Sequence, residues 1–368
     1  MKKVGILTYH TGFNYGASLQ AYALQRTIIN MNVDCEIIHF ETEDFLASRE
    51  MFSRKPRRVK ELIKMATRVP YRRSLIERQR MFDSFTENCL IKSPLYRTEN
   101  EVEEHATDYD CIICGSDQIW NLGTPDAPDA NYVFFLNFPK KQKRVSYAAS
   151  FGKWVYTPHN EEDVLPWLRE FDAISVRESS GQEYLTSRGI DSTLALDPTL
   201  LLDANQYNAI CAERQINDKY VLMFSWNCNN DVIEAAKRVS QKLGYPLYHI
   251  TPPPRALFSG INRKLDAGPR EFLSLIKNAE FVVTNSFHGT AFSTTFEKPY
   301  ISIVSGKADP RMASLLKQLG LSDHLVCVDD IDIDRIMNTD FESVRNKKVE
   351  LRKSSFDFLK SVLEDNIC

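Results

Sequence analysis

The sequence predicts an α/β protein made of two doubly wound domains, each built on a parallel sheet. Short apolar segments typical of buried strands alternate with longer segments of helical periodicity, which indicates parallel strands joined by crossover helices. The 368 residues are enough for two domains of ordinary size, and the polar stretch 203–218 is the best boundary between them. Two such domains would leave a cleft between them, with strand ends facing it from both sides.

The first half of the chain supplies the N-terminal domain, residues 1–203. Residues 4–8 are expected to form a strand, residues 17–31 a helix, and residues 35–40 a second strand. Later strands are expected at residues 109–114, 144–148, 173–176 and 192–196. A helical insertion near residues 45–90 interrupts this series.

The second half supplies a C-terminal domain, residues 204–340. Its strands are expected at residues 220–225, 247–251, 281–284 and 300–304. Residues 341–365 have the periodicity of one long helix, with apolar positions at Phe356, Phe358, Leu359, Val362 and Leu363. By analogy with other two-domain folds, the terminal segment 341–368 returns to pack on the first domain.

Composition indicates a globular protein with ample core and no global charge bias. Hydrophobic residues make up 43% and charged residues 26%, and the net charge is −3. No apolar stretch approaches the length that crosses a membrane, and the apolar run after Met1-Lys2-Lys3 is too short for a signal peptide. A cytoplasmic location is therefore expected.

The spacing of metal-binding residue types predicts neither a metal nor a cofactor. Cys111 and Cys114 have ligand spacing, but no matching second pair exists and both lie in an apolar strand. Buried reduced thiols are the default for such cysteines. No cluster of His, Asp and Glu has ligand spacing along the chain.

Residues 49–80 carry twelve lysines and arginines against three glutamates. Val59, Leu62, Ile63 and Ala66 follow helical spacing, so the segment is expected to be a basic amphipathic helix. A solvated helix face explains these charges. The alternative is a docking surface for anionic lipid or a charged glycan, with peripheral contact at the inner membrane face. Nucleic acid is not an expected partner, because Tyr71 is the only aromatic residue interleaved with the charges from Lys55 to Arg73.

The strongest functional signal is His288, between the strand 281–283 and a helix expected at 291–296. The intervening turn, residues 284–289, contributes Asn285, Ser286 and Gly289. Anions bind where strands end and a helix begins, because amides and the positive end of the helix dipole are exposed there. An imidazole at this point can contact a phosphate and transfer a proton near neutral pH. The alternative role is a structural cap.

Two loops in the first half also follow strands. Asn14 and Gly16 follow the first strand, and Asn14 can donate to an oxyanion or a sugar hydroxyl. A plain strand–helix turn explains that loop equally well. Gly115, Ser116 and Asp117 follow the strand at 109–114, where Asp117 could accept a hydroxyl proton or orient a sugar. Its alternative role is to cap the next helix.

Two arginines are candidate anion ligands. Arg177 emerges at the end of the strand 173–176, where a guanidinium can bind a carboxylate or phosphate in bidentate fashion. A surface pair with Glu178 is the alternative. Arg311 begins a helix, where a positive charge is unfavourable unless an anion compensates it.

The other histidines carry weaker signals. His10 could line the crevice, whereas His39 is expected to be structural. His249 is expected in the core or at an edge, and His324 at the surface.

Five motifs in register resemble the polysaccharide pyruvyl transferase family over about residues 5–320. They are Asn14-x-Gly16 with Ser18-Leu19-Gln20, Gly115-Ser116-Asp117-Gln118-x-Trp120-Asn121, Ser175-Val176-Arg177-Glu178, Leu196-Asp197-Pro198-Thr199 and Asn285-Ser286-Phe287-His288-Gly289. The resemblance implies two Rossmann-like domains in a GT-B-like fold. It also implies transfer of a pyruvyl group from phosphoenolpyruvate to sugar hydroxyls of a cell-surface polysaccharide precursor, with formation of a cyclic ketal. In that family an arginine and a histidine of the matching motifs serve the donor, which implies such roles for Arg177 and His288.

The residues suit that chemistry. Phosphoenolpyruvate is a compact trianion, and Arg177, Arg311, His288 and the amides around Gly289 could bind it. The hypothesis gives His288 a proton transfer, Arg177 the donor's carboxylate or phosphate, and Asp117 the acceptor, which is an oligosaccharide with or without a lipid carrier. Two alternatives stay open: a nucleotide-sugar glycosyltransferase of the same fold, and a catalytically idle glycan-binding protein.

Overall fold

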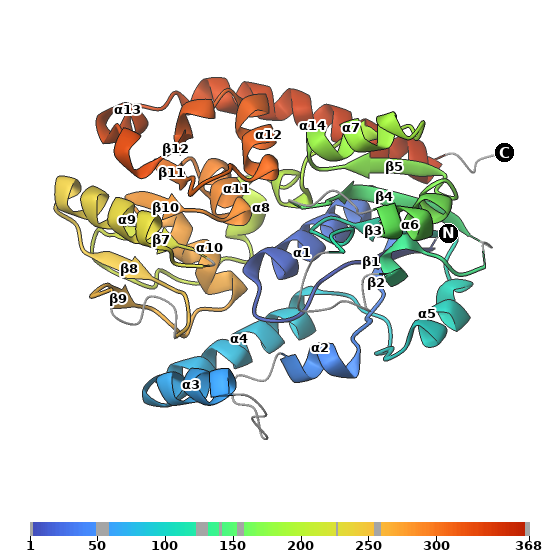
Figure 1. Ribbon diagram of the computed structural model, residues 1–368, viewed down its shortest axis with the longest axis horizontal. Helices are drawn as coiled ribbons and strands as arrows, with labels where there is room; N and C mark the ends of the chain where they lie inside the picture. The colour runs from blue at the N-terminus through green and yellow to red at the C-terminus, as the bar shows by residue number, and fades with distance from the viewer. Residues whose placement is uncertain are drawn as a thin grey trace. The chain divides into compact units, whose positions relative to one another are not determined.

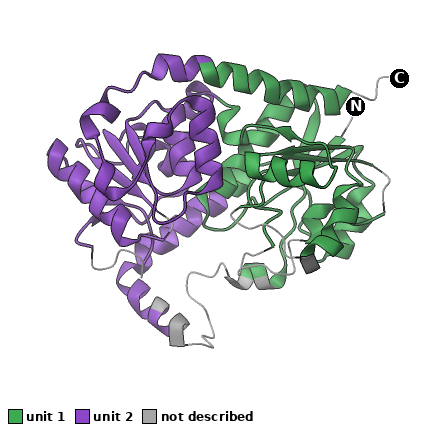
Figure 2. Ribbon diagram, turned by 45° about the horizontal axis from the view of Figure 1, so that its top comes forward, with its two compact units in different colours: residues 1–49, 86–202, 347–368 green, residues 50–85, 203–346 purple. Residues whose placement is uncertain are grey.

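A computed structural model describes residues 3–48, 59–122, 132–139, 142–152, 158–225, 227–253 and 259–364 (Figure 1). The chain divides into two compact units (Figure 2). Unit 1 comprises Met1–Arg49, Thr86–Leu202 and Lys347–Cys368, and unit 2 comprises Glu50–Phe85 and Asp203–Asn346. The basic insertion, expected within the N-terminal domain, thus groups with unit 2, and the end of the terminal helix groups with unit 1.

Unit 1 is built on a six-stranded parallel sheet with the strand order β2-β1-β3-β4-β5-β6. Its strands are β1 (Lys3–Leu7), β2 (Asp34–Ile37), β3 (Cys111–Gly115), β4 (Lys143–Ala149), β5 (Ala173–Val176) and β6 (Thr193–Leu194). The connecting helices include α1 (Tyr15–Asn30), α2 (Glu43–Ser48), α5 (Glu99–Ala106), α6 (Pro158–Leu168) and α7 (Ser179–Ser187), with 3₁₀ turns η2 (Tyr132–Phe135) and η3 (Pro198–Leu200). The parallel pairing brings the carboxyl ends of all six strands to one edge.

Helix α1 lies against β3 because glycine permits the approach. A Cβ added at Gly115 would come within 2.5 Å of the Leu24 side chain, closer than carbon atoms can approach. The helix begins after Asn14, whose side-chain oxygen accepts hydrogen bonds from the amides of Gly16 and Ala17 at 3.0 and 3.3 Å. Asn14 and Gly115 therefore have structural roles: Asn14 caps the start of α1, and Gly115 lets α1 pack closely against β3.

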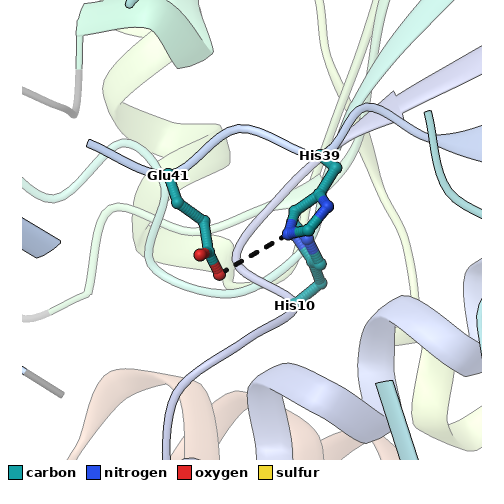
Figure 3. A group of neighbouring side chains, drawn as sticks. All are labelled: His10, His39 and Glu41. Carbon is teal, nitrogen blue, oxygen red and sulfur yellow. Dashed lines mark ion pairs between the residues drawn. The ribbon is translucent and has the colours of Figure 1, made fainter. Parts of the chain in front are cut away.

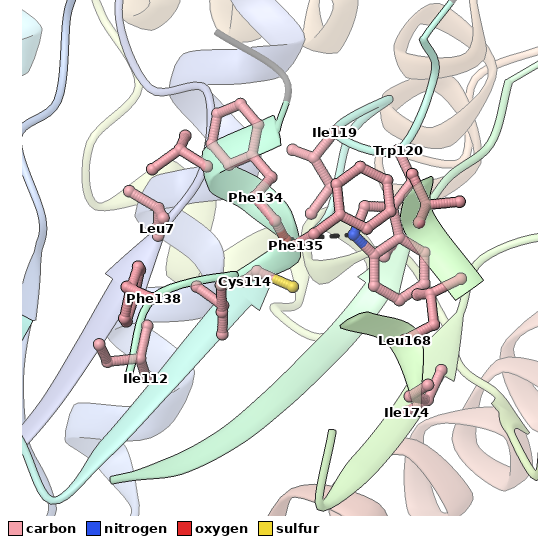
Figure 4. Packing of buried hydrophobic residues seen from close by; sticks show 14 of the residues in the cluster. Leu7, Ile112, Cys114, Ile119, Trp120, Phe134, Phe135, Phe138, Leu168 and Ile174 are labelled. Carbon is pink, nitrogen blue, oxygen red and sulfur yellow. Dashed lines mark hydrogen bonds between the residues drawn. The ribbon is translucent and has the colours of Figure 1, made fainter. Parts of the chain in front are cut away.

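The core of unit 1 is rich in aromatic side chains (Figure 4). The fully buried Trp120 stacks on Phe135, with ring centroids 5.8 Å apart, and its indole nitrogen donates to the backbone carbonyl of Phe134 at 3.2 Å. This packing fixes the loop that follows β3. Cys114 is also buried here, and burial raises the pKa of its thiol. The expectation of buried thiols at Cys111 and Cys114 is confirmed.

The end of helix α14 (Phe341–Glu364) packs on unit 1. Arg352 donates from Nε to the carbonyl of Leu200 at 2.6 Å, and the Ser355 hydroxyl accepts from the amide of Leu196 at 3.0 Å. The Lys143 ammonium donates to the carbonyl of Val362 at 2.9 Å. These contacts hold the segment after β6, which carries Asp197.

Unit 2 repeats the same architecture with the strand order β12-β11-β10-β7-β8-β9, again parallel. Its strands are β7 (Val221–Phe224), β8 (Leu247–His249), β9 (Asn262–Arg263), β10 (Phe281–Thr284), β11 (Tyr300–Ile303) and β12 (Leu325–Val326). Its helices are α3 (Val59–Arg68), α4 (Arg72–Cys89, shared with unit 1), α8 (Ala204–Asn208), α9 (Asn230–Leu243), α10 (Pro269–Lys277), α11 (Phe287–Thr295), α12 (Pro310–Leu319) and α13 (Ile333–Met337), with 3₁₀ turns η1 (Val69–Tyr71), η4 (Ser322–His324) and η5 (Val328–Asp330).

Helices α3 and α4 form the described part of the basic segment; residues 49–58 lie outside the described residues. Helical structure is confirmed over residues 59–80. A fully solvated face is wrong for Arg78, which is buried and donates to the carbonyl of Ile250 at 3.0 Å. Arg68 likewise donates to the carbonyl of Pro253 at 3.1 Å. Part of the positive charge therefore holds α3 and α4 to the segment after β8.

Among the described residues, no helix is both long enough and apolar enough to cross a membrane.

Candidate functional site

The candidate site residues fall into two groups, one at the carboxyl edge of each sheet. In unit 1 the group centres on Arg177, which directly follows β5 and is buried. Its Nη1 donates to Oδ2 of Asp197 at 2.5 Å, and its Nη2 lies 3.9 Å from Oδ1 of Asp117. One guanidinium thus faces two carboxylates in a desolvated setting, where charge interactions are strong.

Asp197 is held by three further hydrogen bonds. The Ser116 hydroxyl donates to Oδ2 at 2.9 Å. The amide and hydroxyl of Thr199 both donate to Oδ1, at 2.9 and 2.6 Å. Because all of these groups are buried, Asp197 fixes the position of the Arg177 guanidinium. Asp197 lies in one of the five motifs, but the sequence alone did not predict a role for it.

Asp117 occupies a backbone conformation that few residues other than glycine adopt, with φ of 66°. Its Oδ1 accepts from the amide of Gln118 at 2.9 Å, and its carbonyl accepts from the amide of Ser150 at 3.0 Å. No helix begins in the described residues directly after it, so the alternative role as a helix cap is wrong. Backbone strain of this kind concentrates at functional sites. Burial, together with the Asp117 charge, raises the pKa of the neighbouring Tyr9 hydroxyl.

Glu178 has partners of its own. Its Oε1 accepts from the amide of Phe151 at 2.7 Å and from the Ser150 hydroxyl at 3.2 Å, and the residue is fully buried. The alternative of a surface Arg177–Glu178 pair is therefore wrong. Glu178 instead ties the end of β4 to the end of β5, beside a register shift between Ser146 and Ala149.

In unit 2 the group centres on His288, the second residue of α11. The helix was expected to begin at residue 291 but begins at Phe287, so His288 lies within its first turn. Ser286 occupies the cap position, and the alternative role of His288 as the cap is wrong. His288 is buried, with 7% of the residue's surface exposed. Because it lies in the first turn, this residue is close in sequence to the exposed amides and the positive end of the helix dipole.

Gly289 lets α11 approach the sheet closely. A Cβ at this position would lie 2.2 Å from Oγ1 of Thr284 and 3.0 Å from the Phe224 ring. The Thr284 hydroxyl donates to the carbonyl of Phe224 at 2.6 Å and accepts from the amide of Ser286 at 3.0 Å. Thr284 therefore links β7, β10 and the start of α11, and holds His288 at the strand edge.

Asn285 and Arg311 are the other candidate ligands of unit 2. The Asn285 amide donates to the side chain of Asn227 at 2.6 Å. Arg311 forms a bidentate pair with Asp309, at 2.9 Å from Nε and 2.6 Å from Nη2. Asp309 also caps α12 by accepting from the amide of Arg311 at 3.0 Å. This carboxylate supplies the negative charge that compensates Arg311 at a helix N-terminus.

His249 ends β8 and is fully buried, as expected for a core position. Neither ring nitrogen has a hydrogen-bond partner among the described residues. Burial, together with the nearby Arg263 charge, lowers the pKa of this imidazole to about 4. His324, expected at the surface, is also buried, and burial lowers its pKa.

Because the pKa values of His249 and His324 are lowered in the folded protein, we expect the free energy of unfolding to fall in mild acid. In the unfolded chain the pKa of His249 is about 6.5, so between pH 6.5 and 4 the unfolded state binds more protons than the folded state. The free energy of unfolding therefore falls as pH falls through this window, by up to about 3 kcal/mol for His249. Chemical denaturation from pH 7.5 to 4.5 measures the loss. His249→Leu should flatten the curve, and equal slopes for both proteins would contradict the assignment.

Comparison with known proteins identifies the family. The sequence model described as polysaccharide pyruvyl transferase matches residues 14–306, most of the chain. The chain belongs to the polysaccharide pyruvyl transferase family. The matched range includes Asn14, Asp117, Arg177 and His288. Membership supports a role in pyruvyl transfer in polysaccharide metabolism, with a polysaccharide acceptor. None of the curated proteins matches the sequence.

Solved structures show the fold of this pyruvyl transferase family member. A UDP-N-acetylglucosamine 2-epimerase structure from Listeria monocytogenes aligns with a TM-score of 0.57 at 10% identity, covering 99% of this chain and 96% of that chain. The enzyme from Neisseria meningitidis, bound to UDP-GlcNAc, gives 0.54 at 11% identity, covering 100% of both chains. The enzyme from Rickettsia bellii gives 0.53 at 11% identity, covering 99% and 96%. The predicted GT-B-like fold of two Rossmann-like domains is confirmed.

Proposed function

We propose that this protein transfers the pyruvyl group of phosphoenolpyruvate to two hydroxyls of a saccharide in a cell-surface polysaccharide precursor, and so forms a cyclic ketal. The observation that carries the proposal is the family match over a range that includes both Arg177 and His288. Each of these residues lies buried at the carboxyl end of a parallel strand, the edge where α/β folds bind ligands.

The reaction sets three requirements for the site. The methylene carbon of the enol gains a proton, and the two acceptor hydroxyls form bonds to the central carbon as they lose their protons. The bond from that carbon to the phosphate oxygen breaks, and inorganic phosphate leaves with the second proton. A proton donor, a proton acceptor and cations for the carboxylate and phosphate are therefore needed.

His288 is proposed to transfer the proton to the donor or to the leaving phosphate. The ring lies in the first turn of α11, where helix amides and the dipole favour an anion. Arg311 adds a cation to unit 2, although its pairing with Asp309 offsets that charge. Asn285, Ser286 and Gly289 supply the turn that would hold the phosphate.

Arg177 is proposed to bind the carboxylate or phosphate of the donor, and Asp117 to accept a hydroxyl proton from the acceptor. At 3.9 Å, Asp117 is beyond hydrogen-bond distance of the guanidinium. A donor anion at Nη2 would take the place of Asp117 beside Arg177. Asp197 holds the other end of the guanidinium in place throughout.

Phosphate release tests this function. The full-length protein is incubated with phosphoenolpyruvate and with saccharide acceptors linked to a nucleotide or to a lipid carrier. Phosphate and a pyruvate ketal should appear only when donor and acceptor are both present. Thermal unfolding should shift upward with phosphoenolpyruvate but not with nucleotide sugars that do not serve as acceptors. A shift with nucleotide sugars alone would favour the glycosyltransferase alternative, and no shift with either would favour a glycan-binding protein.

We also propose that α3 mediates peripheral contact with an anionic membrane. Its apolar residues Leu62 and Ile63 are more than half exposed, at 53% and 55%, and Val69 is 60% exposed. The exposed Arg72 and Arg73 follow at the start of α4. Exposed apolar side chains beside basic ones match the interface of an anionic bilayer. The protein should sediment with vesicles containing phosphatidylglycerol but not with phosphatidylcholine vesicles, and Leu62→Glu with Ile63→Glu should abolish this. Equal sedimentation of the variant would contradict the proposal.

A further inference from the structure

Three side chains at the carboxyl edge of the unit 1 sheet converge on one point (Figure 3). They are His10, which follows β1, and His39 and Glu41, which follow β2. Each offers one ligand atom, and these atoms all lie within 4.8 Å of one another. The chemistry proposed above uses none of the three.

The chain topology explains why they meet. β1 and β2 pair in parallel with Ile6 opposite Ile37, so the residues that follow both strands emerge side by side. The amide of His39 donates to the Ser93 hydroxyl at 2.9 Å, and the amide of Glu41 donates to the carbonyl of Tyr96 at 3.0 Å. The backbone of both residues is therefore fixed, and their side chains converge on a defined point.

The His10 ring has the orientation of a metal ligand. Nδ1 of His10 lies 2.9 Å from the carbonyl oxygen of Thr8. A carbonyl only accepts, so Nδ1 carries the ring proton and Nε2 presents its lone pair. Metal-bound histidines are typically held in this way. Thr8 is itself fixed, since its hydroxyl accepts from Gln20 at 3.0 Å and donates to the carbonyl of Ser116 at 3.1 Å.

Distances and burial also fit a cation. Nε2 of His39 lies 3.8 Å from Oε1 of Glu41, near the separation of about 3.4 Å between two ligands of tetrahedral zinc. The His10 and His39 rings are 5.1 Å apart, at an angle of 74°. His10 and Glu41 are both buried. Imidazoles and carboxylates are the groups that hold divalent cations in protein interiors.

A small cavity adjoins this cluster and leaves room for one more ligand. His10 and Glu41 line it together with Tyr9 and Phe134. Its volume of about 10 Å³ is enough for about one water molecule. Three protein ligands plus one water is the arrangement of zinc sites that keep an open position.

We propose that His10, His39 and Glu41 form a binding site for one divalent cation of the zinc class, with a water molecule from the adjoining cavity as the fourth ligand. Two imidazoles and one carboxylate favour zinc, iron(II) or cobalt(II) over calcium or magnesium, which prefer oxygen ligands. The competing explanation is a metal-independent ion pair between His39 and Glu41.

Metal titration of the full-length protein decides between these explanations. The protein is stripped with a chelator and titrated with Zn²⁺ by calorimetry, and with Co²⁺ by absorption spectroscopy. One ion per chain should bind, Co²⁺ should show the intense visible bands of four-coordinate geometry, and calcium should not compete. Absence of stoichiometric binding would overturn the proposal.

Variants locate the site. His10→Gln, His39→Gln and Glu41→Gln should each weaken Zn²⁺ binding by at least about tenfold. His105→Gln is the matched control, because His105 is exposed and pairs with Asp108 at 3.1 Å. Its affinity should equal that of the wild type. Thermal unfolding without metal checks the fold, and Zn²⁺ should raise the melting temperature only where the site is intact. Unchanged affinity in the folded ligand variants would refute the assignment. Phosphoenolpyruvate is absent from all of these measurements, so their outcome is independent of the pyruvyl transfer assay.

Discussion

His288→Ala is expected to lower the rate of phosphate release from phosphoenolpyruvate by roughly 10²–10⁴-fold, the usual contribution of a positioned acid or base. The imidazole lies buried in the first turn of α11, and the chemistry assigned to it requires a titratable ring at that point. Steady-state phosphate release at saturating donor measures the effect. The loss should appear in kcat, because a proton transfer acts in the transition state.

A second buried histidine of unit 2 provides the control. His324 is almost fully buried, and its Nε2 lies 3.0 Å from the Thr339 hydroxyl. His324→Ala removes the same side chain from the interior of the same unit, and it should reduce stability without a comparable loss of kcat. Circular dichroism and thermal unfolding establish that both variants fold. A folded His288→Ala protein that keeps near-normal turnover would refute the proton-transfer role.

The architecture followed from the alternation of apolar and helical segments, but the exact ends of elements did not. Strands β9 and β12, which were not expected, have two residues each and are too short to give a periodic signal. Helix α11 begins four residues before its expected start. The later start was expected because Asn285, Ser286 and Gly289 have the composition of a turn. Position 289 requires glycine because close packing against Thr284 excludes a Cβ, and this tertiary constraint has no local signature.

The residues of the candidate site were predicted, but the hydrogen bonds and ion pairs between them were not. Arg177 and His288 were expected at strand ends because parallel sheets bind ligands there, and both lie at such ends. Their partners could not be predicted, because Asp197 lies 20 positions from Arg177 and reaches it only through the fold. The same limit applies to His10, His39 and Glu41. Metal-ligand spacing is a local pattern, whereas this cluster forms when β1 and β2 pair.

Removing Asp197 should cost about 3–5 kcal/mol of unfolding free energy, because a buried guanidinium would lose its partner. The pair is 2.5 Å apart, with side chains 2% and 0% exposed. Asp197→Asn removes the charge but keeps hydrogen-bonding capacity, and Arg177→Met leaves the carboxylate without its guanidinium. Denaturant unfolding at pH 7 should show large losses for both. The double variant Arg177→Met with Asp197→Leu should recover part of the loss, because the Asp197 charge is then no longer buried without its partner, although Asp117 still lacks the guanidinium.

A surface pair of unit 1 shows what burial adds, and a lysine variant separates stability from function. Arg188 and Glu161 lie 2.7 Å apart but are 38% and 19% exposed, so Arg188→Met should cost no more than about 1 kcal/mol. Losses of similar size for Arg177→Met would mean that the pair with Asp197 is not structural. Arg177→Lys keeps a positive charge but not the two-pronged geometry. If Arg177 also binds the donor, this variant should raise the KM for phosphoenolpyruvate, because one ammonium cannot contact Asp197 and a second anion in the same way. Expressed as free energies, the loss of donor binding should exceed the loss of unfolding free energy.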